Sequence, residues 1–265
     1  MKNNLLLFVL LFSFYGYSQS SWTKIYHTDA QINKNVFRAS FPKDFKLFST
    51  SIDQLNVVLN KAPNHLQSQN SKSIITIPNS NGILERFEIY EFSNLSPELQ
   101  SQFPQIRSFV GKGLDDKAAT IRLSSDPKGI QVMIFRTGKR NEFIEPYTTD
   151  GSVYVVYESQ RNKGELPFVC STIDTNLFNE LAADLTLSAR SSNQQLLNFR
   201  LALSCNGEYA TYHGGTVAGA LAAMNATMTR VNGVFEKDLA IHMTIIANNA
   251  AVIFTNAATD RKSVV

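Results

Sequence analysis

Short runs of β-branched and aromatic residues, separated by turn-forming residues, constrain the fold of residues 21–160 more than any other feature of the sequence. Most of the separating segments are rich in Gly, Pro, Asn or Asp, as in NSNG at 79–82 and DPKG at 126–129. This spacing is typical of antiparallel strands, so it predicts an antiparallel sheet or a small sandwich. The predicted strands are Ser73–Pro78, Arg86–Phe92, Ala119–Leu123, Ile130–Phe135, Asn141–Pro146 and Ser152–Tyr157.

Residues 52–61 follow a helical pattern instead. Leu55, Val58 and Leu59 fall on one helical face, and Pro63 ends the segment. We therefore expect one helix within the otherwise β-rich part.

The C-terminal part has a different order of elements. An apolar strand is expected at 200–204, and a long helix is expected to begin after Gly214-Gly215 and to end at Asn232-Gly233. Two further strands are expected at 240–247 and 251–255. Apolar residues recur along the helix at the spacing of a core-facing stripe, namely Val217, Leu221, Met224, Met228 and Val231. Strand, helix and strand in this order predict a βαβ-like unit.

The N-terminal residues have the features of a secretory signal peptide. The basic Lys2 precedes the apolar run from Leu5 to Tyr15, and residues 16–20 (GYSQS) are small enough for a signal-peptidase site after Ser18 or Ser20. The apolar run is shorter than the about 20 residues that span a bilayer. We therefore expect a signal peptide at 1–20, a secreted, extracellular protein, and no membrane span after signal removal.

Composition agrees with a globular secreted chain. The chain is 43% hydrophobic and 18% charged, as in globular proteins. Its 265 residues are enough for one large or two modest domains. The net charge of +3 is spread along the chain without a basic stripe interleaved with aromatic residues, so we expect no nucleic-acid partner.

Four blocks of the C-terminal part carry a family resemblance. They are FRLALS at 199–204, GEYATYHGG at 207–215, RVNGVFEKDLAI at 230–241, and the apolar run that ends in VIFTN at 252–256. In this order they resemble the opening of the catalytic domain of secreted bacterial reprolysin-like zinc metalloproteases, members of the metzincin group.

Segments of the N-terminal part look like the prodomain of the same family. The helix at 52–61, PNSNGILERFEIYE at 78–91 and GKGLDDKAATIRL at 111–123 carry this resemblance. It implies an α+β chain, in which a β-rich antiparallel prodomain is followed by the incomplete N-terminal part of a metzincin-like α/β catalytic domain. The expected organisation is a signal peptide at 1–20, a prodomain at 21–185, a linker at 186–197 and a truncated catalytic domain at 198–265.

The resemblance implies a zinc-dependent endopeptidase, made as a secreted zymogen, that acts on proteins or peptides. The zinc-binding motif of the family, H-E-x-x-H-x-x-G-x-x-H, does not occur in the sequence, and no two of His27, His65, His213 and His242 are spaced as i and i+4. We therefore expect zinc and peptide hydrolysis only for a full-length parent, and no catalytic residue, metal ligand or activity in this chain. The RKSVV after Asp260 continues neither the strand pattern nor the resemblance, which indicates a truncation or a frame change; a natural short product is the alternative.

Two functions without catalysis remain open. The chain could be a secreted prodomain-like inhibitor or chaperone that occupies a related protease, or a non-enzymatic binding module.

Cys170 and Cys205 are the two cysteines of the chain. Cys170 lies in LPFVCS, and the P-x-x-C within it resembles the cysteine switch of metzincin zymogens, in which a prodomain thiolate holds the open position of the catalytic zinc. Ser171 stands where that pattern usually has glycine. A disulfide between Cys170 and Cys205 is the alternative for an extracellular protein, and two inert thiols are the third possibility.

The connector between the two halves is polar. Residues 177–189 could form a helix, and RSSNQQ at 190–195 gives little reason for burial. We expect maturation cleavage at or near Arg190; an ordinary solvated loop that is never cut is the alternative.

Overall fold

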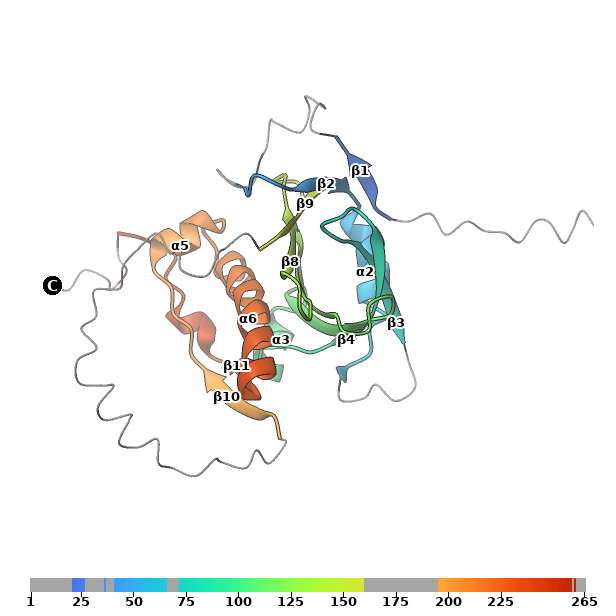
Figure 1. The fold of residues 1–265 in the computed structure, drawn as a ribbon. Coiled ribbons are helices and arrows are strands. Elements are labelled where there is room, and N and C mark those ends of the chain that lie inside the picture. The colour runs from blue at the N-terminus through green and yellow to red at the C-terminus, as the bar shows by residue number, and fades with distance from the viewer. Residues whose placement is uncertain are drawn as a thin grey trace, which may run out of the picture.

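The computed structural model describes residues 21–26, 36, 41–65, 72–159, 195–258 and 260. Its N-terminal part is a nine-stranded antiparallel sheet with the order β1-β2-β9-β8-β7-β6-β5-β4-β3, which curls around helix α2 (Figure 1). The strands are β1 Thr23–Ile25, β2 Lys46–Ser49, β3 Ser73–Pro78, β4 Leu84–Glu91, β5 Arg107–Gly113, β6 Thr120–Asp126, β7 Gly129–Phe135, β8 Glu142–Pro146 and β9 Val153–Glu158.

Helix α2 (Ile52–Leu59) supplies one side of the main hydrophobic core. Its Leu55 and Leu59 are each 1% exposed and pack with alternate residues of the strands, among them Phe87 and Phe109. Because successive strand residues point to opposite faces, one residue in two along each strand reaches this core. The curl of the sheet therefore encloses the apolar face of α2.

Most of the predicted sheet is confirmed, as one curled sheet rather than a sandwich. The predicted helix at 52–61 is confirmed as α2. Strand β5 was not predicted, because its sequence RSFVGKG contains two glycines and a lysine. Gly111 in β5 is required by close approach to β4, since a Cβ there would lie 2.5 Å from the carbonyl oxygen of Glu88.

The C-terminal part is a parallel βαβ unit, as predicted. Strands β10 (Leu197–Leu201) and β11 (Ile241–Ile245) pair in parallel, joined through α5 (Gly207–Tyr212) and the long helix α6 (Val217–Leu239). Helix α6 lies between the β10–β11 pair and the curled sheet (Figure 1). Thr216 caps α6 by accepting a hydrogen bond from the backbone N–H of Gly219. Among the described helices, none combines the length and the apolar character needed to cross a membrane.

Three predictions for this part were wrong. The strand predicted at 200–204 is β10 at Leu197–Leu201, so it begins and ends three residues earlier. Helix α6 continues through Asn232-Gly233 and ends at Leu239; the residue that follows, Ala240, is its C-cap and has a left-handed φ of 54°. Asn232 does not act as a helix end because its side chain is buried and bonded to other elements, and Gly233 is packed so closely against the sheet that a Cβ would lie 2.8 Å from the Phe135 ring. The strand predicted at 251–255 is instead a 3₁₀ turn, η4 (Asn249–Val252), followed by a single bridge.

Candidate functional site

The connection from β4 to β5 packs against the C-terminal part. This connection, residues 93–106, is called the α3 segment because it carries helix α3 (Pro97–Gln102). Ser96 caps α3 by accepting from the N–H of Leu99, and a proline follows at the first helical position. Its apolar side chains share one hydrophobic core with the C-terminal part, which contains Leu95, Leu99, Ile106, Leu221, Met224, Met228 and Ile245 among its buried members. One hydrophobic core therefore contains residues from both sides of the linker predicted at 186–197.

The α3 segment also extends the β10–β11 sheet by backbone hydrogen bonds. The N–H of Ile245 donates to the carbonyl of Asn94 at 2.7 Å, and the N–H of Ser96 donates to the carbonyl of Ile245 at 2.9 Å. Leu95 thereby forms a parallel bridge with Ile245. The edge of β11 that faces away from β10 is thus paired at this point.

A buried network of amide side chains lies beneath this bridge. Asn94 Nδ2 donates to Asn225 Oδ1 at 3.0 Å and to Thr229 Oγ1 at 2.8 Å, and Asn232 Nδ2 donates to Asn94 Oδ1 at 3.0 Å. All four side chains are 4% exposed or less. Asn232 also holds β11 through both backbone groups of Met243. A buried polar group without a hydrogen-bond partner destabilises the folded state, so only the position of α6 that pairs these groups is favoured. The network therefore fixes the position of α6 on the α3 segment.

Two ion pairs join α6 to the sheet, one with the anion on α6 and the other with the cation on α6. Arg122 of β6 contacts Glu236 of α6 at 2.5 Å, and Arg230 of α6 contacts Glu145 of β8 at 2.6 Å. Each side therefore supplies one cation and one anion, which fixes the orientation of the helix on the sheet.

His242 of β11 completes the Glu236 site. Its Nδ1 lies 2.8 Å from Glu236 Oε1, and its ring lies 4.4 Å from that of Phe92. Burial opposes ionisation of Glu236, but the bonds from His242 and Arg122 outweigh it and lower the pKa of that carboxyl group. The negative charge at Glu236 is therefore part of the native contact between α6, β6 and β11.

Glu236→Gln is expected to lower the free energy of unfolding by about 2–3 kcal/mol at pH 7, because Arg122 loses its anion in a largely buried place. Since the folded-state pKa of Glu236 is lowered, its contribution is complete above an ordinary glutamate pKa of about 4.3 and is lost as the pH falls through the folded value. Urea unfolding between pH 3 and pH 7 should therefore show a smaller difference between variant and wild type at the acid end. Glu98→Gln, at an exposed position of α3, is the control and should show almost no difference at either pH; a constant difference for Glu236→Gln would contradict the assignment.

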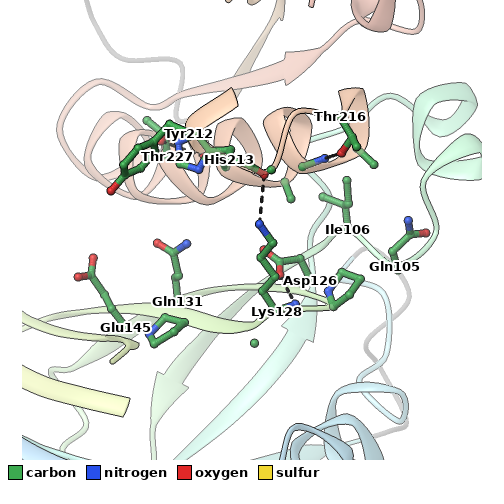
Figure 2. Close-up of a pocket in the computed structure, with 18 of the residues that line it drawn as sticks. Gln105, Ile106, Asp126, Lys128, Gln131, Glu145, Tyr212, His213, Thr216 and Thr227 are labelled. Carbon is green, nitrogen blue, oxygen red and sulfur yellow. Dashed lines mark hydrogen bonds between the residues drawn. The ribbon is translucent and has the colours of Figure 1, made fainter. Parts of the chain in front are cut away.

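A cavity of about 480 Å³ opens between the two parts (Figure 2). The β6–β7 turn and strands β7 and β8 line one side, and α5 with the first half of α6 lines the other. Lys128 reaches across it and donates to the carbonyl oxygen of His213 at 3.1 Å. Burial, followed by the charge of Lys128, lowers the pKa of His213, and burial raises the pKa of Asp126. The cavity walls thus combine the Arg230–Glu145 ion pair with His213, whose lowered pKa leaves its imidazole neutral at pH 7.

The described residues do not fit a zinc site. No group of three or more His, Cys, Asp or Glu side chains in this part of the chain could hold a metal ion. His213 ends α5 against Tyr209, whereas His242 is bound to Glu236 on β11.

The predicted cysteine and cleavage sites are only partly covered. Cys205 has no disulfide partner among the described residues; it is half-buried against the core of α6, and burial raises the pKa of its thiol, which disfavours the thiolate. Cys170 and Arg190 lie outside the described residues, as do the predicted signal peptide and the helix at 177–189. The switch, the disulfide and the cleavage at Arg190 stay predictions.

Sequence reasoning missed the contact between the α3 segment and α6. The signal was present in Asn225, Thr229 and Asn232, which recur at i, i+4 and i+7 on the buried side of α6. Polar residues at helical spacing within an apolar stripe indicate a buried polar partner. The partner itself, Asn94, is too far away in sequence to be found without the fold.

A family model described as metallo-peptidase family M12B, reprolysin-like, matches residues 197–264. The match begins with the first residue of β10 and takes in α5, α6 and β11. The C-terminal part is therefore similar to reprolysin-like metallopeptidases, a family that depends on zinc in general. No curated protein matches the chain.

Proposed function

We propose that residues 195–260 form the opening of a zinc metalloendopeptidase domain, and that residues 21–159 belong to the prodomain of a secreted zymogen. The observation that carries the proposal is the agreement between the family match at 197–264 and the parallel βαβ unit formed by β10, α6 and β11. The shared core supports a prodomain that is folded onto the protease part rather than tethered beside it.

Peptide hydrolysis is proposed only for a protein that also carries H-E-x-x-H-x-x-G-x-x-H. The test is to sequence the source DNA beyond the codon for Asp260 and to translate all three frames through about a kilobase. The motif in any frame would support the proposal, whereas its absence from every frame would overturn the protease assignment for the parent protein.

The purified chain is expected to be inactive. It should retain no zinc at a one-to-one ratio after gel filtration, measured by elemental analysis, and should not cleave casein, because the described residues provide no metal site and the sequence lacks the motif. A longer protein with the motif, assayed in parallel, is the positive control. Casein cleavage by the chain itself that a chelator abolishes would contradict the prediction.

Secretion is proposed from the signal peptide at 1–20. Trp22 is 4% exposed, donates from Nε1 to the carbonyl of Thr76 at 2.8 Å, and packs its ring 5.3 Å from that of Tyr154. Processing must therefore leave Trp22 in the mature chain for this contact to form. N-terminal sequencing of exported protein should begin at Gln19 or Ser21; a mature chain that begins beyond Trp22, or a cytoplasmic protein that keeps Met1, would overturn the proposal.

A chaperone role for the N-terminal part is the second candidate, and the contact with α6 favours it. The α3 segment supplies core residues and backbone partners to a unit that begins almost ninety residues later in the chain. A protein containing the motif should then refold in higher yield with residues 21–159 present than without them; equal yields would count against this role.

A further inference from the structure

We infer that the N-terminal and C-terminal parts stay bound to each other as a noncovalent pair when the connector between Ser159 and Gln195 is cut. The interaction surface is the α3 segment together with the outer face of β5, β6 and β8, and its partner is the α6–β11 unit of the same chain. The inference rests on the proposed function only in naming the N-terminal part a prodomain. It says that cleavage of the connector does not by itself release that prodomain.

The C-terminal part lacks a complete core of its own. The side of α6 that carries Leu221 and Met224 is covered by Leu95, Leu99 and Ile106, which are 3%, 0% and 1% exposed. If the α3 segment left, these side chains on both parts would return to water. Such hydrophobic burial is the main favourable term in the association of proteins.

The backbone contact strengthens the same interaction. Ile245 of β11 bonds through both its N–H and its carbonyl to Asn94 and Ser96. This arrangement is the addition of a short strand segment to an open sheet edge, which is a common mode of peptide recognition. Departure of the α3 segment would leave this edge unpaired.

The polar groups at the surface make separation more costly. Asn225, Thr229 and Asn232 are buried and share Asn94 as a partner, while Glu236 and Arg230 of α6 each find an opposite charge on the sheet. None of these contacts passes through the connector. The contacts that hold the two parts together therefore survive a cut in it.

The test uses the full chain with residues 191–194 replaced by the recognition sequence of a site-specific protease. After complete cutting, verified by denaturing gel electrophoresis, native gel filtration is compared with that of the uncut protein. We expect one peak at the uncut position that contains both fragments. Two separate peaks at micromolar concentration would overturn the inference.

Leu95→Ala and Val57→Ala form a matched pair for the same experiment. Leu95 is 3% exposed at the contact, whereas Val57 is 57% exposed on α2. Loss of the buried leucine side chain should speed dissociation of the cut pair by at least about tenfold. The dissociation rate is measured from the exchange of one fragment of the pair for a labelled copy. Val57→Ala should leave this rate unchanged. Unchanged dissociation for Leu95→Ala would mean that this surface does not hold the pair.

Two controls distinguish a weakened contact from misfolding and from failure of the proposed function. Circular dichroism and hydrogen exchange of β6 and β7 in uncut Leu95→Ala establish that the sheet is still folded before the cut is made. The readout needs neither zinc nor any proteolytic activity of the protein itself, so separation of the fragments would leave the metalloprotease proposal untouched. A source gene without the zinc motif would equally leave a persistent pair unaffected.

Discussion

Replacing Arg136 with leucine is expected to lower the free energy of unfolding by about 3–5 kcal/mol at pH 7. The Arg136 side chain follows β7 and is 4% exposed. It contacts Glu85 of β4 and Glu142 of β8 at 2.7 Å each, and Asp116 of the β5–β6 connection at 3.0 Å. Burial opposes its charge, but the bonds to Glu142 and Glu85 outweigh this effect and raise the pKa of the guanidinium group. Without the cation, Glu142, whose side chain is 6% exposed, is left buried and charged.

The pH dependence separates this cause from a simple loss of packing. The backbone N–H of Ala118 and then Arg136 lower the pKa of Asp116, so the stabilisation that this carboxylate gains from Arg136 is complete above its ordinary pKa and is lost as the pH falls through the folded value. The difference between Arg136→Leu and wild type should therefore shrink when urea unfolding is repeated below pH 3.8. Arg140→Leu removes the same charge from an exposed position in the same loop and is expected to change stability by less than about 0.5 kcal/mol. A loss for Arg136→Leu that does not change with pH would point to the missing side-chain volume instead.

The parts of the fold that could be predicted are those decided by neighbouring residues. Strands β3, β7 and β9 have β-branched and aromatic residues between turn formers, and α2 has an apolar face followed by a proline, so local pattern alone identifies them. The apolar stripe of α6 was likewise predicted as core, and Leu221, Met224 and Met228 are buried.

The errors arose where a distant contact decides the conformation. Gly111 weakens the strand pattern of β5 but is needed because β4 passes so close to it. Asn232-Gly233 has the sequence of a helix end, yet α6 continues because the amide of Asn232 bonds to Asn94 and β11 while Gly233 lets the sheet approach. Local propensity is a weak preference of about 1 kcal/mol per residue, which such tertiary contacts override.

The same reason explains why the candidate site was not predicted. The family resemblance predicts zinc ligands for a parent protein and roles for Cys170 and Arg190, whereas the described residues form a buried polar network between the α3 segment and α6. Asn94 and its partners are more than 130 positions apart in the chain. No periodicity within either segment relates them.

Asn94→Leu is expected to lower the free energy of unfolding by about 3 kcal/mol or more, because several buried groups lose a hydrogen-bond partner at once. The oxygens of Asn225 and Thr229 lose their donor, and one N–H of Asn232 loses its acceptor. The change should appear in urea unfolding as a lower midpoint. Asn248→Leu, at an exposed position whose side chain caps nothing, is the control and should stay close to wild type.

A double-mutant cycle with Asn232→Leu decides whether the network is the cause. If Asn94→Leu is destabilising because it leaves buried partners without a hydrogen bond, removal of one partner should relieve part of this effect. The loss of unfolding free energy in the double variant should then be smaller than the sum of the two single losses by about 1–2 kcal/mol. Additive losses would mean that each leucine is destabilising through its own misfit. Asn94 belongs to the N-terminal part and Asn232 to the C-terminal part. A coupling energy between them would therefore measure directly how much this network stabilises the contact between the two parts.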